Sequence, residues 1–447
     1  MGILGSTWHG IGATGIALLG CCACGSGGQG DPGAADHSGA KPNLILISLD
    51  TLRADRLGCY GYDRPTSPCI DALAERGTLF ENTVAEAPWT LPAHASMLTG
   101  LFPRTHGVTQ PSRRLPSEIP TLAQILSNAG YTTIGLTEGG YLARDYGLHQ
   151  GFQIYSENRP DLATTLDTAR DLLAQVRGEA PFLLFLHTFD VHCPYDPPAE
   201  HALLLRSDDE QPIETAGSCG ADFNAAPLTA GQVRTLSNRY DGGIHSVDAL
   251  LGTFLGELEA DGALDDTFVV ITSDHGEEFY EHGRIGHERT VHREALRVPW
   301  IVIGPGVIPS RVSALVGLTD VTPTLLDLVG VPGIDTMEGR SLAHCVRGAA
   351  VDSDDPRISE LEWKTELYSV MTSSHQLIVD GKLGQRTLIR FTGAGEEETV
   401  DGGGKLEQEY LSVLEEHLSR SGGQAASRVD DLDPAQQERL KALGYGD

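Results

Sequence analysis

Several polar residues in this sequence carry the side chains that metal-assisted and nucleophilic chemistry needs. In chain order they are Asp50, Thr90, His94, Asp190, His192, Asp274, His275 and His287. Carboxylates and imidazoles are the ligands that divalent ions such as Zn²⁺ and Mn²⁺ take from proteins. A hydroxyl at the start of a helix can attack an electrophile beside such an ion, since both favour its ionised form. These residues therefore point to metal-assisted chemistry, with Thr90 as the candidate nucleophile.

Apolar runs precede most of these residues and are expected to position them. Residues 43–49 form a continuous Leu/Ile run, typical of a strand buried on both faces. Similar runs occupy 132–136, 182–186, 267–272 and 299–303. Helical patterns alternate with them at 70–76, 121–129, 162–176, 244–258 and 322–328. The alternation predicts an α/β fold with a doubly wound, mostly parallel sheet, in which ligands bind where strands end.

The pattern changes after residue 345. Short antiparallel strands are expected at 368–371, 375–379 and 388–391, followed by an acidic, Gly-rich loop at 393–404 and two polar helices. We therefore predict a catalytic domain over 42–345 and a small C-terminal α+β subdomain with a helical tail over 346–447.

The first residues have the pattern of an export signal. A short apolar run ends in Leu-Leu-Gly-Cys21, as at a lipoprotein cleavage site, and a Gly/Ser-rich stretch follows. Residues 1–10 contain no Lys or Arg, unlike most export signals, and the Met-Gly start also fits a myristoylation pattern. We predict a leader at 1–24, a flexible linker at 25–41 and an exported lipoprotein in the periplasm, outer membrane or cell surface. Its membrane contact would be the lipid anchor alone.

The net charge of the chain limits the kinds of molecule that it can bind. The formal charge of −30 argues against nucleic acid, which needs a basic surface. An anionic substrate would need a local positive focus, which a bound metal could supply.

Five cysteines follow the leader, so at least one is unpaired within the chain or pairs outside it. Cys59 with Cys69, or Cys193 with Cys219, could form a disulfide in an oxidising compartment. Buried thiols are the equally simple alternative.

Six stretches of the chain resemble the sulfatase family of the alkaline-phosphatase superfamily. The likeness runs through residues 42–346, and its motifs lie at 43–55, 60–62, 90–100, 273–278 and 283–299, with a further one at 440–445. It implies the sulfatase fold and a metal-dependent ester hydrolase.

The nucleophile segment departs from the family pattern. Sulfatases carry Cys-x-Pro-Ser-Arg, whose Cys or Ser becomes formylglycine, whereas this chain has Thr90-Leu-Pro-Ala-His94. Threonine cannot reach the same aldehyde, because its Cβ carries a methyl group. Thr51 stands for an Asp of the family, and His287 for a Lys. These exchanges resemble the phosphate pockets of related phosphodiesterases and phosphotransferases.

The resemblance implies one divalent ion held by Asp50, Thr90, Asp274 and His275, and a possible second held by Asp190, His192 and His287. Zn, Mn and Ca are all compatible. His94 would face the transferred group and His192 would protonate the leaving group. Each residue also has a simpler structural role: Asp50 could cap a turn, Thr90 a helix, and a lone histidine could fill the core. The resemblance also covers residues that we expect to support the fold or to face solvent: Arg53, Asp55, Arg104, His106, Glu277, His282 and Asp320.

Three functions follow from these residues. The first is a hydrolase or transferase of phosphoric esters acting through Thr90 on a small-molecule, glycan or lipid anionic ester. The second is a sulfuric ester hydrolase that works without formylglycine. The third is a non-catalytic anion-binding protein, against which the intact Asp50, Thr90, Asp274 and His275 argue.

Overall fold

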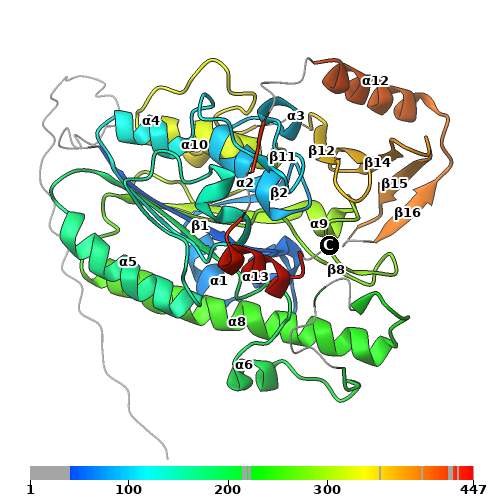
Figure 1. The fold of residues 1–447 in the computed structure, drawn as a ribbon, viewed down its shortest axis with the longest axis horizontal. Helices are drawn as coiled ribbons and strands as arrows, with labels where there is room; N and C mark the ends of the chain where they lie inside the picture. The colour runs from blue at the N-terminus through cyan, green and yellow to red at the C-terminus, as the bar shows by residue number, and fades with distance from the viewer. Residues whose placement is uncertain are drawn as a thin grey trace, which may run out of the picture. The chain divides into compact units, whose positions relative to one another are not determined.

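An eight-stranded sheet, ordered β11-β2-β10-β7-β1-β6-β4-β5, runs through the main body of the chain (Figure 1). Its strands are β1 (Asn43–Leu49), β2 (Thr78–Val84), β4 (Thr132–Leu136), β5 (Ile154–Ser156), β6 (Phe182–Thr188), β7 (Thr267–Thr272), β10 (Arg297–Ile303) and β11 (Ser310–Gly317). Strand β10 is antiparallel to both neighbours, and the other neighbouring pairs are parallel. The predicted mostly parallel sheet is confirmed.

Burial on both faces explains why β1 is a continuous apolar run. Leu44 and Leu46 pack into the core on one face, while Ile45 and Ile47 pack into the core on the other. Successive strand side chains point to opposite faces, so a central strand needs apolar residues at every position.

Helices cover both faces of the sheet, as a doubly wound fold requires (Figure 1). One layer contains α1 (Pro68–Ala74), α5 (Leu162–Val176) and the long α8 (Ala230–Ala260). The other contains α2 (Thr90–Thr99), α4 (Leu122–Asn128) and α10 (Val321–Leu328). Helix α8 begins before the expected residue 244, because Thr229 and Gln232 form a capping box at its start. Such a cap stabilises a helix by about 1 kcal/mol.

A five-stranded antiparallel sheet follows, with the order β12-β13-β14-β15-β16. Its strands are β12 (Arg357–Leu361), β13 (Leu367–Met371), β14 (His375–Asp380), β15 (Arg386–Phe391) and β16 (Glu397–Val400). Helix α12 (Lys405–Ser419) packs Tyr410 and Leu414 on this sheet. The expected loop at 393–404 is wrong in part, because β16 pairs with β15 inside it. The predicted α+β character of this region is confirmed.

Short elements complete the chain. They are β3 (Arg113–Arg114), β8 (Glu278–Phe279), β9 (Ile285–Gly286), β17 (Ser427–Arg428), α3 (Pro103–His106), α6 (Ala199–Leu204), α9 (Arg293–Leu296), α11 (Ala343–Val346) and α13 (Pro434–Ala442). Residues 41–447 form one compact unit, so the C-terminal sheet is packed on the main sheet rather than set apart.

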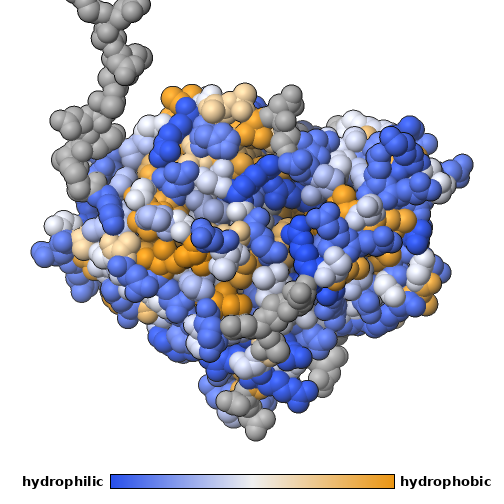
Figure 2. Space-filling view, turned by 90° about the horizontal axis from the view of Figure 1, so that it is seen from above, coloured by the Kyte–Doolittle hydropathy of each residue, from blue (hydrophilic) through white to orange (hydrophobic). Residues whose placement is uncertain are grey.

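The computed structural model describes residues 41–213, 219, 223–351, 354–393, 396–420, 426–429 and 432–445. The leader, the lipidation site at Cys21 and most of the linker lie outside them and stay predictions. In the described part of the chain, no helix combines the length and apolar character needed to span a bilayer. Hydrophilic residues cover much of the face in Figure 2, with apolar residues gathered in separate areas between them.

Candidate active site

The ends of three neighbouring parallel strands meet at one edge of the main sheet. Asp50 directly follows β1, Asp274 lies just beyond β7, and His187 lies in β6 beside Ser48. Thr51 turns the chain at this edge with a φ of 61°, a conformation that is costly for a β-branched residue. Its N–H points at Asp274 Oδ1 at 3.4 Å. The turn therefore holds the two buried carboxylates side by side.

Thr90 is the first residue of α2 and is fully buried. Its hydroxyl donates to Asp50 Oδ2 at 3.3 Å and lies 3.4 Å from His275 Nε2. The hydroxyl of Tyr445 lies 3.0 Å from the same Thr90 oxygen. The start of α2 adds partial positive charge where this oxygen would carry negative charge. Thr90 is thus placed as a nucleophile would be.

Hydrogen bonds determine which ring nitrogen of three histidines carries the proton. His192 Nδ1 donates to the carbonyl of Cys193 at 2.8 Å, and His275 Nδ1 donates to the carbonyl of Gly276 at 2.9 Å, since a carbonyl can only accept. His287 Nδ1 lies 2.9 Å from the Glu277 carboxylate. All three rings therefore present a lone pair at Nε2, the form that binds a metal.

Burial keeps these rings neutral. It lowers the pKa of His287 to about 3, and burial together with the neighbouring His287 lowers the pKa of His192 to about 3. A neutral His192 whose only proton is used on Cys193 cannot donate to a leaving group. The geometry favours a ligand or acceptor role for His192 over the predicted role of general acid.

The carboxylates fit a cation. Asp50 Oδ1 and Asp274 Oδ2 are buried, and no described residue hydrogen-bonds to either oxygen. His275 Nε2 lies 3.8 Å from the first oxygen and 3.4 Å from the second. Burial raises the pKa of Asp50, as does the neighbouring Asp274, and burial also raises the pKa of Asp274. Since unpaired buried carboxylates are costly, a divalent ion among these three ligands would neutralise them.

His94 packs against the backbone of Thr90 instead of pointing past its hydroxyl. One helical turn after Thr90, its Nδ1 donates to the Thr90 carbonyl at 2.8 Å, and its Nε2 accepts from Ser48 at 3.0 Å. Its Nδ1 also lies 3.4 Å from Asp274 Oδ2. His94 therefore orients α2 and the carboxylate, which differs from the predicted contact with substrate.

The structure does not bring Asp190 to the cluster. Its Oδ2 accepts from the backbone N–H of Leu162 at 3.1 Å, at the start of α5, where a carboxylate is stabilised by the helix dipole. Among the described residues it belongs to none of the groups whose ligand atoms lie within 4.8 Å of one another. The structure therefore places Asp190 apart from the candidate ligands Asp50, Asp274 and His275.

Two residues of the site are not predicted from the sequence. His187 donates from Nε2 to Asp50 Oδ2 at 3.1 Å, and the hydroxyl of Tyr445 lies 3.2 Å from His287 Nε2 and 3.3 Å from His192 Nε2. His187 directly follows the apolar run at 182–186. This position at a strand end is the sequence signal that could have identified it. Glu277 has the predicted supporting role, holding His287 while it accepts from Tyr195 at 2.7 Å.

The residues expected to be scaffold form pairs within the fold. Arg53 bridges Asp55 and Glu281, while Asp320 pairs with Arg357 at 2.7 Å. These charges are paired with one another, and none of these residues hydrogen-bonds to the Thr90 hydroxyl.

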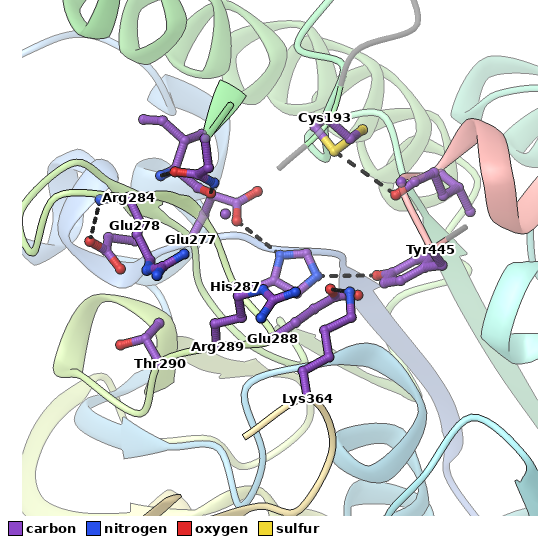
Figure 3. A pocket seen from close by; sticks show the side chains of 16 residues that line it. Cys193, Glu277, Glu278, Arg284, His287, Glu288, Arg289, Thr290, Lys364 and Tyr445 are labelled. Atoms are coloured by element: carbon purple, nitrogen blue, oxygen red, sulfur yellow. Dashed lines mark hydrogen bonds and ion pairs between the residues drawn. A yellow bond between two sulfur atoms is a disulfide. The ribbon is translucent and has the colours of Figure 1, made fainter. Parts of the chain in front are cut away.

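A pocket opens beside Thr90, lined by Glu277, His287 and Tyr445 (Figure 3). Lys364 lines it too and is paired with Glu288. Arg284 and Arg289 also line it, and neither forms an ion pair with a described residue. The pocket thus offers two guanidinium groups to a ligand, beside the carboxylates of Glu277, Glu278 and Glu288 that also line it.

A disulfide borders this pocket. Cys193 and Cys219 are bonded, while Cys59, Cys69 and Cys345 are free thiols. This confirms one of the two predicted bridges and the prediction of an unpaired cysteine. Because Cys193 follows His192 and supplies its carbonyl partner, the bridge restrains the backbone that carries a site histidine.

Residues 42–331 match the profile of the sulfatase family. The chain belongs to that family. It is a hydrolase of the alkaline-phosphatase superfamily, in which metal dependence is typical.

Named relatives of this sulfatase-family protein include two sulfatases. The ulvan-active sulfatase of Formosa agariphila is 25% identical over 350 residues, covering 70% of this chain and 66% of the relative, just under two thirds. The Δ4,5-hexuronate-2-O-sulfatase of Bacteroides thetaiotaomicron is 24% identical over 90% of this chain and 94% of its own. A phosphonate monoester hydrolase from Silicibacter pomeroyi has the same fold, with a TM-score of 0.70, 21% identity and coverage of 85% and 94%.

The Tyr445 hydroxyl should matter to turnover in this sulfatase-family protein. We expect Tyr445→Phe to lower kcat by about 10²-fold with a smaller change in KM. The change removes the hydroxyl that lies within 3.3 Å of Thr90 Oγ1, His287 Nε2 and His192 Nε2. Tyr141→Phe is the matched control, since this buried ring packs 4.5 Å from that of Tyr445. A faster Tyr445→Phe enzyme would mean instead that the phenol blocks the site.

Proposed function

We propose that this protein is a hydrolase or transferase of phosphoric esters, with Thr90 as nucleophile and two divalent ions as cofactors. The single observation that carries the proposal is the setting of Thr90 Oγ1, within 3.4 Å of Asp50, His275 and Tyr445. The histidine-rich surroundings favour two ions, one with Asp50, Asp274 and His275, and another with His192 and His287.

Threonine favours phosphorus over sulfur. A formylglycine sulfatase releases sulfate by reforming its aldehyde, and the methyl-bearing Cβ of Thr90 has no such exit. A Thr90 ester must therefore be opened by attack at the central atom, which suits a phosphoryl centre surrounded by positive charge. Divalent ions at this site would supply that charge and lower the pKa of the neighbouring hydroxyl.

The residues of the chain can carry the protons. As Thr90 Oγ1 bonds to phosphorus, its proton passes to Asp50 Oδ2, its hydrogen-bond acceptor, and the bond from phosphorus to the leaving oxygen breaks. The leaving oxygen, opposite Thr90 Oγ1 in an in-line displacement, takes a proton from solvent in the open pocket. The Tyr445 hydroxyl, 3.0 Å from Thr90 Oγ1, can donate a hydrogen bond to a non-bridging oxygen of the phosphoryl group. Water, or an acceptor alcohol, then attacks phosphorus and releases its proton to solvent, while Thr90 recovers its own proton from Asp50.

The pocket supports an anionic substrate larger than a phosphate. Arg284 and Arg289, whose charges are not used in ion pairs with described residues, line it next to His287. Several relatives are named for sulfated glycans, among them the ulvan-active and hexuronate sulfatases. We infer an acidic or phosphorylated glycan, or a lipid with such a headgroup, as the substrate class.

Sulfuric esters are the second candidate, favoured by the names of those relatives. The deciding experiment measures kcat/KM of the metal-reconstituted enzyme on an aryl phosphodiester, a phosphonate monoester, a phosphomonoester and the matched aryl sulfate. We expect at least one of the phosphorus esters to turn over faster than the sulfate. A clear preference for sulfate contradicts the proposal, and no turnover of any ester by fully loaded protein favours a non-catalytic role.

A further inference from the structure

The loop between β12 and β13 brings a lysine of the C-terminal sheet to the pocket of the catalytic site. Trp363 of this loop packs on Trp89, the residue before the nucleophile, with ring centroids 4.8 Å apart. Lys364 comes next and lines the pocket, where its side chain lies beside Glu288 (Figure 3). The chemistry derived above for the nucleophile does not use this lysine.

The backbone holds Lys364 and Glu288 in an uncommon conformation. Their φ angles are 58° and 60°, in the left-handed region that is costly for residues with a Cβ atom. The two side chains form an ion pair with each other across the wall of the pocket. Residues in such conformations persist only where the surrounding structure holds them, and they gather at ligand-binding sites. This strained pair is therefore a candidate for binding a ligand.

The Lys364 ammonium has hydrogen-bond donors to spare. It carries three N–H donors, and among the described residues its only hydrogen-bond acceptor is Glu288. The ring face of Trp363 lies 4.2 Å from Nζ and accounts for a second side of the ammonium. The lysine side chain keeps 18% of its surface exposed. At least one N–H can thus bind a ligand while Glu288 keeps the side chain in position.

Two other carboxylates of the pocket are already engaged within the protein. Glu277 accepts from Tyr195 and pairs with His287. Glu278 accepts from two backbone N–H groups of its own loop. Neither of them forms an ion pair with Lys364, so Glu288 is the carboxylate with which an anionic ligand would share this lysine.

The pocket suits the part of a substrate that lies beyond the reacting ester. The described residues that line it include His287 and Tyr445 but not Thr90, Asp50 or Asp274. A substrate whose ester reaches the Thr90 hydroxyl would therefore extend its remaining atoms past His287 and Tyr445. Lys364 lines the space that those atoms would occupy.

We propose that Lys364 is a specificity-determining residue that binds a second anionic group of the substrate, such as a carboxylate, and that Glu288 positions it. This inference rests on the proposed function only in that the substrate is an anionic ester cleaved at Thr90. It does not depend on whether phosphorus or sulfur is attacked.

The test compares ligands that differ by one carboxylate. Phenylphosphonate and its 3-carboxy and 4-carboxy derivatives contain no ester bond, so they bind without being turned over. Their Kd values for the metal-reconstituted full chain are measured by calorimetry. We expect wild type to prefer a carboxy derivative, and Lys364→Met to weaken that derivative by at least ~10-fold, the scale of a hydrogen bond between charged groups. Phenylphosphonate should lose much less.

A lysine of the same sheet provides the matched control. Lys382 is exposed in the turn between β14 and β15, and Lys382→Met makes the same chemical change away from the pocket. All three Kd values should stay at their wild-type level in this variant.

Glu288→Gln should change the affinity in the opposite direction. The amide oxygen can still accept from Lys364, while a negative charge next to the ligand is removed, so the carboxy derivative should bind more tightly. A pair that only supports the fold would weaken all three ligands in both variants. Equal losses for all three in Lys364→Met overturn the inference, as do weaker carboxylate binding in Glu288→Gln and a wild type with no preference for either carboxy derivative. Faster turnover of sulfate esters would contradict the proposed function and leave this result unchanged.

Discussion

Thr90→Ala should lower kcat/KM by at least ~10³-fold on the best phosphoester, the scale seen when a nucleophile that works as a unit with its partners is removed. The physical reason is that no other described hydroxyl lies both within 3.3 Å of Asp50 and at the start of α2. Thr90→Ser should retain part of the activity, because the hydroxyl remains and only the rotamer restraint of the methyl group is lost.

The control is a threonine at the other end of the same helix. Thr99 is also buried, and its hydroxyl bonds the carbonyl of Ala95 at 2.6 Å. Thr99→Ser makes the same chemical change as Thr90→Ser and should keep near-wild-type kcat/KM. Rates are measured on the phosphodiester and its sulfate counterpart. A fully active Thr90→Ala enzyme would falsify the assignment of the nucleophile.

Asp274→Asn should abolish most metal binding at the catalytic site and lower activity by at least ~10²-fold. An amide of nearly the same shape replaces a carboxylate whose Oδ2 has no described hydrogen-bond partner, so a ligand charge is lost with little change in packing. After chelation the variant should be at least as stable as wild type, because one of two adjacent buried carboxylates has been neutralised. Added metal should then raise the thermal midpoint of wild type more than that of the variant.

Asp190→Asn provides the matched carboxylate-to-amide control. The amide oxygen can still accept from the N–H of Leu162, so α5 keeps its cap. We expect wild-type metal content and most of the activity, measured by mass spectrometry of the metal and by kcat/KM. Loss of one metal equivalent in Asp190→Asn would restore this residue to the site.

The sequence predicts most of the main sheet because its central strands are buried on both faces. Strands β1, β4 and β7 begin and end where the apolar runs do. The sequence does not predict strands β2 and β11. Glu81 and Asn82 interrupt the apolar pattern of β2, and the first four residues of β11 include three polar ones, Ser310, Arg311 and Ser313. The antiparallel direction of β10 depends on how the chain enters the sheet, and local sequence patterns do not show this.

The site residues also fall into two groups: those that the strand ends predict and those that they do not. Asp50, Asp274 and His275 stand directly after apolar runs, so the edge of the sheet predicts their meeting. Tyr445 is 355 residues from Thr90 in sequence. The resemblance includes a motif at 440–445, but no periodicity or strand end indicates that this hydroxyl docks at Thr90. Asp190 also follows an apolar run, yet the open N–H groups at the start of α5 compete for its carboxylate. Strand ends thus predict which residues gather, and competing backbone donors decide which of them remain.

The position of Tyr445 gives the protein an order of assembly. As the chain leaves the ribosome from its amino end, Asp50, Thr90 and Asp274 emerge long before Tyr445, so the sheet can fold while the nucleophile still lacks its phenolic partner. Docking of α13, whose Leu440 packs into the core, then brings the last hydroxyl to the pocket. A nascent chain stalled before residue 434 would hold a folded sheet and its metal ligands yet turn over substrate poorly. Docking of α13 is therefore the step that completes the catalytic site once the sheet has formed.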